Sequence, residues 1–365
     1  MTRLGDYVRI RTGKLDANVS SENGQYPFFT CAVEPLRIDT YSYDCECVLV
    51  AGNGDLNVKY YNGKFDAYQR TYIIESLDKT VLSVPYLYCF LDKYLETLRQ
   101  QAIGGVIKYI KLGNLTEAEI PIISIAEQKE VVRNIEKSNN LISFRKRQLA
   151  KLDELVKARF VELFGNPVLN PYNWDVVTIG DIVTDVRYGT SKPAVEGGKY
   201  PYLRMNNLTY DGHLDLSDMK YIDIPDNEVE KCIVRKGDVL FNRTNSIELV
   251  GKTCVFDLDD EMVIAGYIIR VRLNEKLLPI VLSSYMNSTV LKEQLRNMAK
   301  GAVNQANINA QELQSVKIYL PPIDIQNQFV AFVEQTDKSK LAIQQSLDKL
   351  EILKKSLMQK YFGGR

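Results

Sequence analysis

The chain has 365 residues, which is enough for two or three domains with cores of their own. Lys and Arg together number 46, as do Asp and Glu, so the net charge indicates no polyanionic partner unless positive charge gathers on one face. A single histidine leaves histidine-based catalysis little to work with, and no apolar run is long enough to span a bilayer.

The N-terminus and the cysteines indicate the compartment. Residues 1–6 lead straight into a strand-like pattern and do not resemble a signal peptide. The six cysteines show no CxxC spacing, which favours reduced thiols over disulfides or a zinc site. We therefore predict a cytoplasmic protein without membrane contact and without a metal ion.

Residues 1–119 are predicted to form a β-rich domain of α+β type. Turn residues separate five strand-like runs, at Tyr7–Ile10, Tyr26–Cys31, Cys47–Ala51, Lys59–Tyr61 and Thr71–Ile74. A helical segment follows from Pro85 to Gln101, and Gly104-Gly105 ends it.

Residues 120–165 are predicted to form one long helix, and the chain repeats it at 318–365. Adding 198 to each residue number superimposes the two copies without a gap, so that Gln128 falls on Gln326 and Phe164 on Phe362. Each copy follows prolines, lacks internal Gly and Pro, and ends at a glycine. Narrow apolar stripes favour an antiparallel coiled coil between the copies, at positions 135, 142, 149, 152 and 155/156 and at 333, 343, 347, 350, 353 and 357.

Residues 166–317 are predicted to comprise a linker, 166–174, and a second copy of the first domain. Ile179-Gly180-Asp181 resembles Leu4-Gly5-Asp6, and the resemblance continues in order along the chain. Further matches pair Gly13 with Gly189, and the segments 26–28 with 200–202, 48–49 with 239–240, and 72–74 with 267–269. The predicted fold is thus an internal duplication: domain, helix, domain, helix.

Enzyme motifs in the sequence are incomplete. Gly251-Lys252-Thr253 resembles the end of a phosphate-binding loop, but Ser246 stands where that loop needs its first glycine. Asn170-Pro171-Tyr172 resembles a base-holding methyltransferase motif, but it lacks the second proline and a cofactor loop. We therefore predict no catalytic residue and no cofactor.

Polar loops at matching places of the two domains are the candidate binding surface. Amides can form bidentate bonds with adenine, and Arg or Lys can bond guanine or phosphate. The same residue types also simply form turns, so the matching positions in both domains carry the argument. The candidates are Lys14, Gln69, Arg70 and Lys108 in the first domain, and Tyr188, Thr190, Ser191, Lys192, Arg204, Asn242, Arg243, Thr244, Asn304 and Gln305 in the second.

The whole chain resembles the specificity (S) subunits of type I restriction–modification systems. The most specific parts are the helix beginnings at 125–132 (Ile-Ala-Glu-Gln-Lys-Glu-Val-Val) and 320–329, together with the helix ends at 164–167 and 347–363. Residues 188–193 and 237–244 are similar to the target-recognition domains of that family.

This resemblance implies a non-catalytic subunit that recognises double-stranded DNA. Each domain would recognise half of a split sequence, and the paired helices, roughly 50 Å long, would space the halves by more than one DNA turn of ~34 Å. Two methyltransferase subunits would dock along the helices and restriction subunits would join them. The methyl donor and ATP would belong to those partners.

Two other classes of function are alternatives. An enzyme with its own nuclease or methyltransferase centre would need a carboxylate cluster or a cofactor loop. A coiled-coil scaffold that does not bind DNA would show no salt-dependent affinity for a duplex, even with partners present.

Overall fold

The chain forms two compact units in a computed structural model that describes residues 1–167, 169–299 and 306–363. One unit contains residues 1–147 and 343–365, and the other contains residues 148–342. Each unit therefore combines one β-rich domain with the beginning of one long helix and the end of the other. No helix among the described residues is both long and apolar enough to cross a bilayer.

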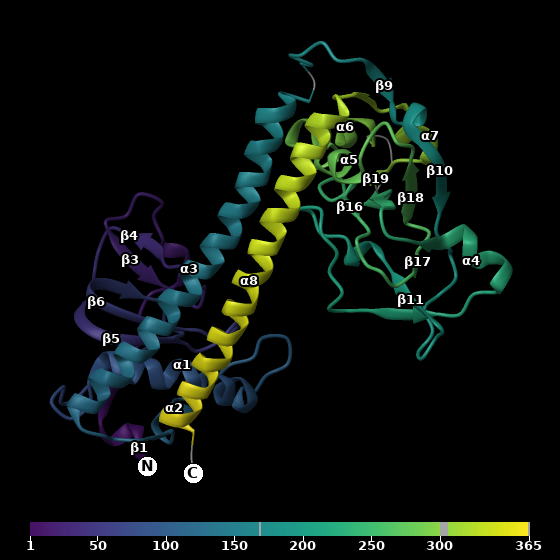
Figure 1. Ribbon diagram of the computed structural model, residues 1–365. Helices are drawn as coiled ribbons and strands as arrows, with labels where there is room; N and C mark the ends of the chain where they lie inside the picture. Colours follow the sequence, from purple (N-terminus) through teal and green to yellow (C-terminus); the bar gives the residue numbers. More distant parts are fainter. Residues whose placement is uncertain (168, 300–305, 364–365) are drawn as a thin grey trace. The chain divides into compact units, whose positions relative to one another are not determined.

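The repeated segments form two 40-residue helices, α3 (Ile125–Phe164) and α8 (Ile323–Phe362). In each unit they lie side by side and run antiparallel (Figure 1). In the first unit the Asn134 side chain donates to the Tyr361 hydroxyl, and in the second the Lys340 ammonium pairs with Asp153 at 2.6 Å. Gly165 ends α3 at φ +72°, a conformation that favours glycine. The predicted antiparallel helix pair is confirmed.

The buried seam between the helices follows the predicted apolar stripes with one exception, at Leu353. Ile135 and Leu347 are buried as expected, and of the two alternatives 155/156 it is Val156 that is half-buried, while Leu155 is 48% exposed. Leu353 is 49% exposed, so its assignment to the seam was wrong. Seam positions alternate at spacings of three and four residues, which places residue 354 there instead.

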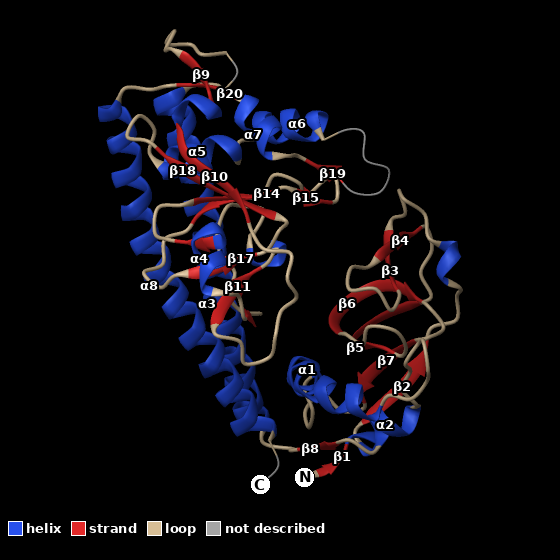
Figure 2. Cartoon of the chain, turned by 90° about the vertical axis from the view of Figure 1, so that its right-hand side faces the viewer, coloured by secondary structure: helices blue, strands red, loops and turns tan. Residues whose placement is uncertain are grey.

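The first domain contains a six-stranded sheet of order β2-β7-β5-β6-β3-β4, in which β3 and β6 alone are parallel neighbours. Helix α1 packs on one face of this sheet, together with Met358 and Phe362 from the end of α8 (Figure 2). The predicted strands and helix are all present, with the bounds β1 (Thr2–Arg3), β2 (Val8–Thr12), β3 (Tyr26–Phe29), β4 (Leu36–Ile38), β5 (Tyr43–Ala51), β6 (Val58–Ala67), β7 (Thr71–Ser76), α1 (Val84–Gln101), α2 (Leu112–Thr116) and β8 (Glu119–Ile120).

The second domain contains two four-stranded sheets, β10-β18-β14-β16 and β12-β11-β17-β13. Its main core joins α5, α6 and α7 to the first of these sheets and to Phe160, Phe164 and Phe329 of the long helices. Its elements are β9 (Val176–Thr178), β10 (Val183–Tyr188), β11 (Tyr200–Leu203), β12 (Lys220–Ile222), α4 (Asp226–Cys232), β13 (Ile233–Val234), β14 (Val239–Asn242), β15 (Thr244–Asn245), β16 (Thr253–Val255), β17 (Met262–Ile264), β18 (Ile268–Leu273), α5 (Pro279–Met286), α6 (Thr289–Met298), β19 (Ala306–Asn307), α7 (Ala310–Ser315) and β20 (Lys317–Tyr319).

Strand pairing shows the duplication directly. In the first domain β3 pairs with β4 and, in parallel, with β6, while in the second β11 pairs with β12 and, in parallel, with β17. The single strand β6 corresponds to both β16 and β17, because the acidic segment 257–261 interrupts the strand between them. A continuous sheet in one copy has thus become two sheets in the other.

The match of Tyr72 with Tyr267 was out of register by two residues. Val48 pairs with Ile74, and the equivalent Val239 pairs with Val271, so residue 74 corresponds to 271 and Tyr72 to Ile269. A slip of two residues keeps every side chain on the same face of the strand, so the apolar pattern cannot detect it.

Candidate nucleic-acid interface

Three loops gather the four candidate residues of the first domain at one end of its sheet. Backbone bonds join them: Gln69 N–H donates to Leu15 O, Gly52 N–H to Arg70 O, and Gly54 N–H to Lys108 O. The side chains of Lys14, Arg70 and Lys108 are exposed there, and the Gln69 amide donates to Asp16 at 2.7 Å. The structure therefore places residues from distant parts of the sequence on one surface.

A glycine begins the equivalent loop in each domain because another strand passes too close for a side chain. A Cβ at Gly13 would lie 2.1 Å from Ala67 O, and a Cβ at Gly189 would lie 2.1 Å from Ile264 O. The predicted equivalence of these two glycines is confirmed by this shared contact. It also fixes where Lys14 and Thr190 leave the sheet.

Arg243 and Tyr188 form the centre of the corresponding surface in the second domain. The Arg243 guanidinium lies 4.9 Å from the centre of the Tyr188 ring, a cation–π distance. The Tyr188 hydroxyl in turn accepts a bond from Ala310 N–H at 2.8 Å. The ring is thus fixed from behind while the guanidinium keeps most of its donors unused, since its only described bond is a long one of 3.5 Å to Gly266 O.

Asn242 and Thr244 support this surface from below. Asn242 is fully buried, and its amide donates to Thr244 O and Tyr267 O while accepting from Asn245. Thr244 is 6% exposed and donates to the Asn307 side chain at 2.8 Å. Both residues hold the loop of Arg243 in shape and have little surface with which to contact a ligand.

The remaining basic candidates of the second domain are paired with surface carboxylates. Lys192 lies 3.0 Å from Glu228, and Arg204 lies 2.7 Å from Asp218. The Arg204 guanidinium holds the pKa of Asp218 below its usual value. Surface ion pairs of this kind contribute about 0–1 kcal/mol, so a phosphate group could replace either carboxylate at small cost.

Thr190 and Ser191 lie in the loop that carries Lys192. The Thr190 hydroxyl accepts from Lys192 N–H, and the Tyr202 hydroxyl donates to the carbonyls of both residues. Ser191 is exposed beside them. Asn304 and Gln305 lie outside the described residues.

Two buried lysines brace the loop of Arg204, and neither was predicted as a site residue. Lys252 donates to Met205 O and Leu208 O, which explains the glycine-lysine pair noted as an incomplete phosphate motif. Lys292 donates to Gly251 O at 2.7 Å and lies over the Tyr210 ring. Burial lowers the pKa of Lys292 to about 7. No spacing rule marks such residues, because their partners are backbone carbonyls.

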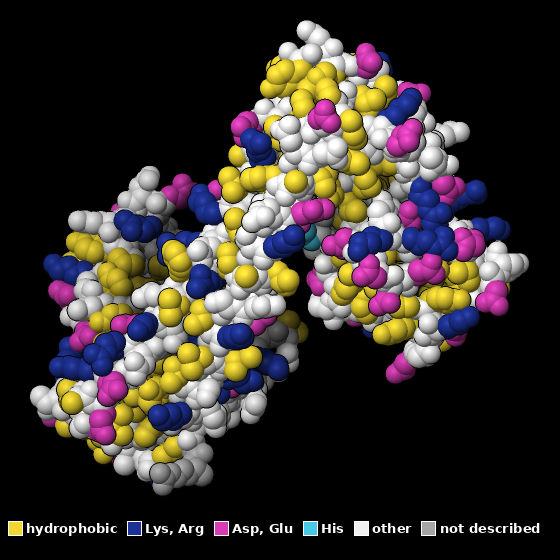
Figure 3. Space-filling view, viewed as in Figure 1, with side chains coloured by type: hydrophobic (Ala, Val, Ile, Leu, Met, Phe, Trp, Pro, Cys, Tyr) yellow, Lys and Arg dark blue, Asp and Glu magenta, His cyan; other side chains and the backbone are white. Residues whose placement is uncertain are grey.

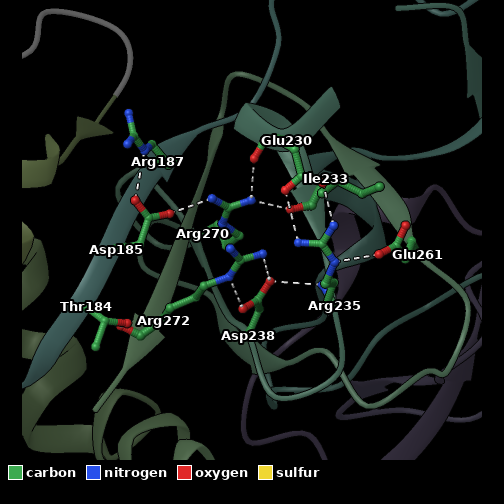
Figure 4. Close-up of polar contacts among 10 residues, drawn as sticks. All are labelled: Thr184, Asp185, Arg187, Glu230, Ile233, Arg235, Asp238, Glu261, Arg270 and Arg272. Atoms are coloured by element: carbon green, nitrogen blue, oxygen red, sulfur yellow. Dashed lines mark hydrogen bonds and ion pairs between the residues drawn. The ribbon is translucent and has the colours of Figure 1, made fainter. Parts of the chain in front are cut away.

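Four arginines of the second domain are paired with carboxylates or carbonyl groups of the same domain (Figure 4). Arg270 on β18 is 1% exposed and bonds Asp185, Glu230 O and Ile233 O. Arg272 makes two bonds to Asp238, and the neighbouring Arg187 and Arg235 pair with Asp185, Glu230 and Glu261. These cations therefore support the fold, and counting arginines overestimates the charge available to a ligand.

Metal and thiol chemistry finds little support in the described part of the chain. The described residues contain no group of three or more His, Cys, Asp or Glu placed to hold a metal ion. All six cysteines are free thiols, and burial raises the pKa of Cys89 and of Cys254 to about 12. Such thiols are inert at neutral pH.

Comparison with known proteins identifies the family. The model of the type I restriction modification DNA specificity domain matches residues 1–154 and 171–352. The type I restriction enzyme EcoDI specificity subunit of Escherichia coli is 35% identical over 154 residues, which are 42% of this chain and 34% of that subunit. The EcoKI specificity subunit of the same species is 24% identical over 291 residues, 74% of this chain and 62% of that subunit. These matches span between a third and two thirds of the relatives' lengths.

The fold is shared with a solved structure. The S subunit of the type I restriction-modification system from M. genitalium covers 100% of this chain and 96% of its own, with a TM-score of 0.60 at 16% identity. Two matched segments, a duplicated β-rich domain and two long antiparallel helices lead to one conclusion. The chain belongs to the type I restriction modification DNA specificity domain family.

Proposed function

We propose that this chain is the non-catalytic subunit that recognises DNA in a type I restriction–modification complex, with one half of a split target bound by each domain. The observation that carries the proposal is the pair of equivalent loop surfaces, each beginning at a glycine pressed against a neighbouring strand. Duplicated scaffolds with different loop side chains suit two half-sites of different sequence. The proposed domains are residues 1–119 and 166–317, and the helical spacers are 120–165 and 318–365.

The basic candidates divide into two roles. The exposed Lys108 and Arg70 and the half-buried Arg243 have donors that can bond base edges, whereas the exposed Lys14 and the half-buried Lys192 and Arg204 suit phosphate contacts that set the register. Phosphate contacts by Lys and Arg make affinity fall steeply with salt. A coiled-coil scaffold that does not bind DNA lacks this salt dependence.

The long helices are the proposed docking site for two methyltransferase subunits, with restriction subunits joining that core. Large apolar side chains are exposed on both helices, and they alternate with basic ones on the visible face (Figure 3). Apolar surface rimmed by charge is typical of protein interfaces. The exposed apolar residues are Leu141, Phe144, Leu155, Val161, Ile323, Leu341, Ile352 and Leu353.

Methylation mapping tests the proposed function. The chain is co-expressed with its cognate methyltransferase subunit, and the host DNA is sequenced for modified bases. The expected result is a split motif of two short defined halves around a fixed gap. Exchange of residues 1–119 for another first domain should change one half alone. Methylation that is unchanged when this chain is deleted would contradict the proposal.

Arg243→Ala is expected to weaken binding of the specific duplex by about 1–3 kcal/mol and to relax the half-site bound by the second domain. The physical reason is the loss of a guanidinium held over the Tyr188 ring, whose one described hydrogen bond is the long contact with Gly266 O. Titration of the methyltransferase complex with labelled duplexes, one base pair changed at a time, measures both effects. Arg187→Ala, which removes an arginine paired with Asp185, is the matched control. Equal binding and equal half-site preference in Arg243→Ala would remove Arg243 from the interface.

A further inference from the structure

The loop between α1 and α2 exposes apolar side chains at its tip. Val106 is fully exposed and Ile107 is 62% exposed, and Ile103 and Tyr109 beside them are 44% and 39% exposed. Single exposed apolar residues need no explanation, but four within seven residues form a patch that marks an interaction site.

The tip is held by a braced hairpin. Ile103 and Tyr109 exchange two backbone hydrogen bonds, of 3.0 and 2.8 Å. Gly104 has φ +120°, and a Cβ there would lie 2.4 Å from Ile107 O, so glycine is required at the bend. Below the bend, Ile110 N–H donates to Gly52 O. The loop therefore presents Val106 and Ile107 in a defined place at small entropic cost on binding.

Exposed cationic side chains lie near the tip. Lys108 and Lys111 follow it in the sequence, and the loop bonds to the segment at Gly52, which bonds Arg70 O. All three cationic side chains are exposed. An apolar tip among exposed cations suits a partner that is both polyanionic and partly apolar, and the major groove of DNA offers both, in its phosphates and its thymine methyl groups.

The sequence of the second domain differs at the aligned positions. Ile308 N–H donates to Arg243 O just as Ile110 N–H donates to Gly52 O, which supports the sequence offset of 198 at this point of the chain. By that offset, Asn304 and Gln305 align in sequence with Val106 and Ile107. Amides suit adenine edges, and branched apolar side chains suit thymine methyls.

We propose that Val106 and Ile107 determine the specificity of the first domain by apolar contact with thymine methyl groups in the major groove. This inference rests on the proposed function and adds the mode of recognition at one loop. It requires at least one A·T pair, contacted through its thymine, in the half-site bound by the first domain.

The test removes single methyl groups from the DNA. With the complete methyltransferase complex and its mapped target, each thymine in the first half-site is replaced by deoxyuridine and the dissociation constant is measured. One position should weaken binding about fourfold, which corresponds to one buried methyl. Uracil substitutions in the other half-site are the matched control. The loop that carries Val106 and Ile107 should not contribute to any change in the dissociation constant that they cause.

The double variant Val106→Asn/Ile107→Gln, which carries the second domain's residues, completes the design. It should lose its sensitivity to uracil and change the methylated motif in the first half alone. Equal affinity of the wild-type complex for thymine and uracil at every position would overturn the inference. A variant whose affinity falls by the same factor on thymine and uracil DNA would overturn it too, because that variant would still distinguish the two bases. The wild-type complex serves as the check on the proposed function, because its failure to methylate a split motif would contradict that function first.

Discussion

Arg270→Ala is expected to lower the free energy of unfolding of the second unit by about 3–5 kcal/mol, because it leaves a carboxylate without its buried partner. Arg270 is 1% exposed, bonds Asp185 and two backbone carbonyls, and lies opposite Leu240 in the sheet. Its equivalent in the first domain is Ile73, which is fully buried among apolar residues. Urea denaturation of the purified chain measures the loss.

A matched control and the pH dependence separate this effect from a general loss of charge. Arg187→Ala removes an exposed partner of the same Asp185 and should cost about 0–1 kcal/mol. Burial opposes ionisation of Asp185, but the two arginines outweigh burial and keep its pKa below the ordinary value. A lowered pKa contributes stability above the unfolded-state value near 4, and this stability is lost as the pH falls through the folded-state value. Arg270→Ala should therefore flatten the acid limb of stability. Equal costs for the two variants would contradict this account.

Gln326→Ala is expected to destabilise the second unit by about 3 kcal/mol or more, since each buried group left without a partner costs about 1–3 kcal/mol. Gln326 is fully buried at the start of α8. Its amide accepts from Leu278 N–H, where α5 begins, and donates to Lys276 O and Pro321 O. The side chain thus ties the long helix to the domain beside it.

The duplication supplies an independent repeat of this experiment. Gln128 is also fully buried, accepts from Ser83 N–H and donates to Val81 O and Ile123 O. Gln128→Ala should therefore destabilise the first unit by a similar amount. The exposed Gln328, two residues beyond Gln326, provides the matched control, and its alanine variant should remain within about 0.5 kcal/mol of wild type. Thermal unfolding that is monitored by hydrogen exchange shows which of the two units each variant destabilises. A stable Gln326→Ala variant would show that packing alone holds the joint.

The sequence allowed the architecture to be predicted because the duplication is itself a strong signal. Identical residues at an offset of 198 align the helices, and turn glycines align the domains, so strands, helices and the antiparallel pair followed from patterns alone. The sequence shows the same residue at positions 128 and 326 without indicating why. The structure gives the reason, because each glutamine side chain makes an equivalent set of three hydrogen bonds.

The interface was less predictable, because residue type does not reveal burial or pairing. Asn242 has the chemistry of a base contact but is enclosed by its own loop, while Lys192 and Arg204 already have carboxylate partners far away in the sequence. Val106 and Ile107 were not predicted as site residues, because they are apolar and their importance depends on their exposure. The strand register was predicted wrongly because Tyr72 and its true equivalent, Ile269, differ in residue type.

The composition of the first unit has a consequence for biosynthesis. Its core includes Met358 and Phe362, so the first domain cannot complete its core until residue 362 has been made. At about 5–20 residues per second, the more than two hundred residues between positions 147 and 362 take roughly 10–40 seconds. The second unit is continuous in sequence and can close earlier. A premature stop near the C-terminus therefore damages the N-terminal domain, the part of the protein already synthesised.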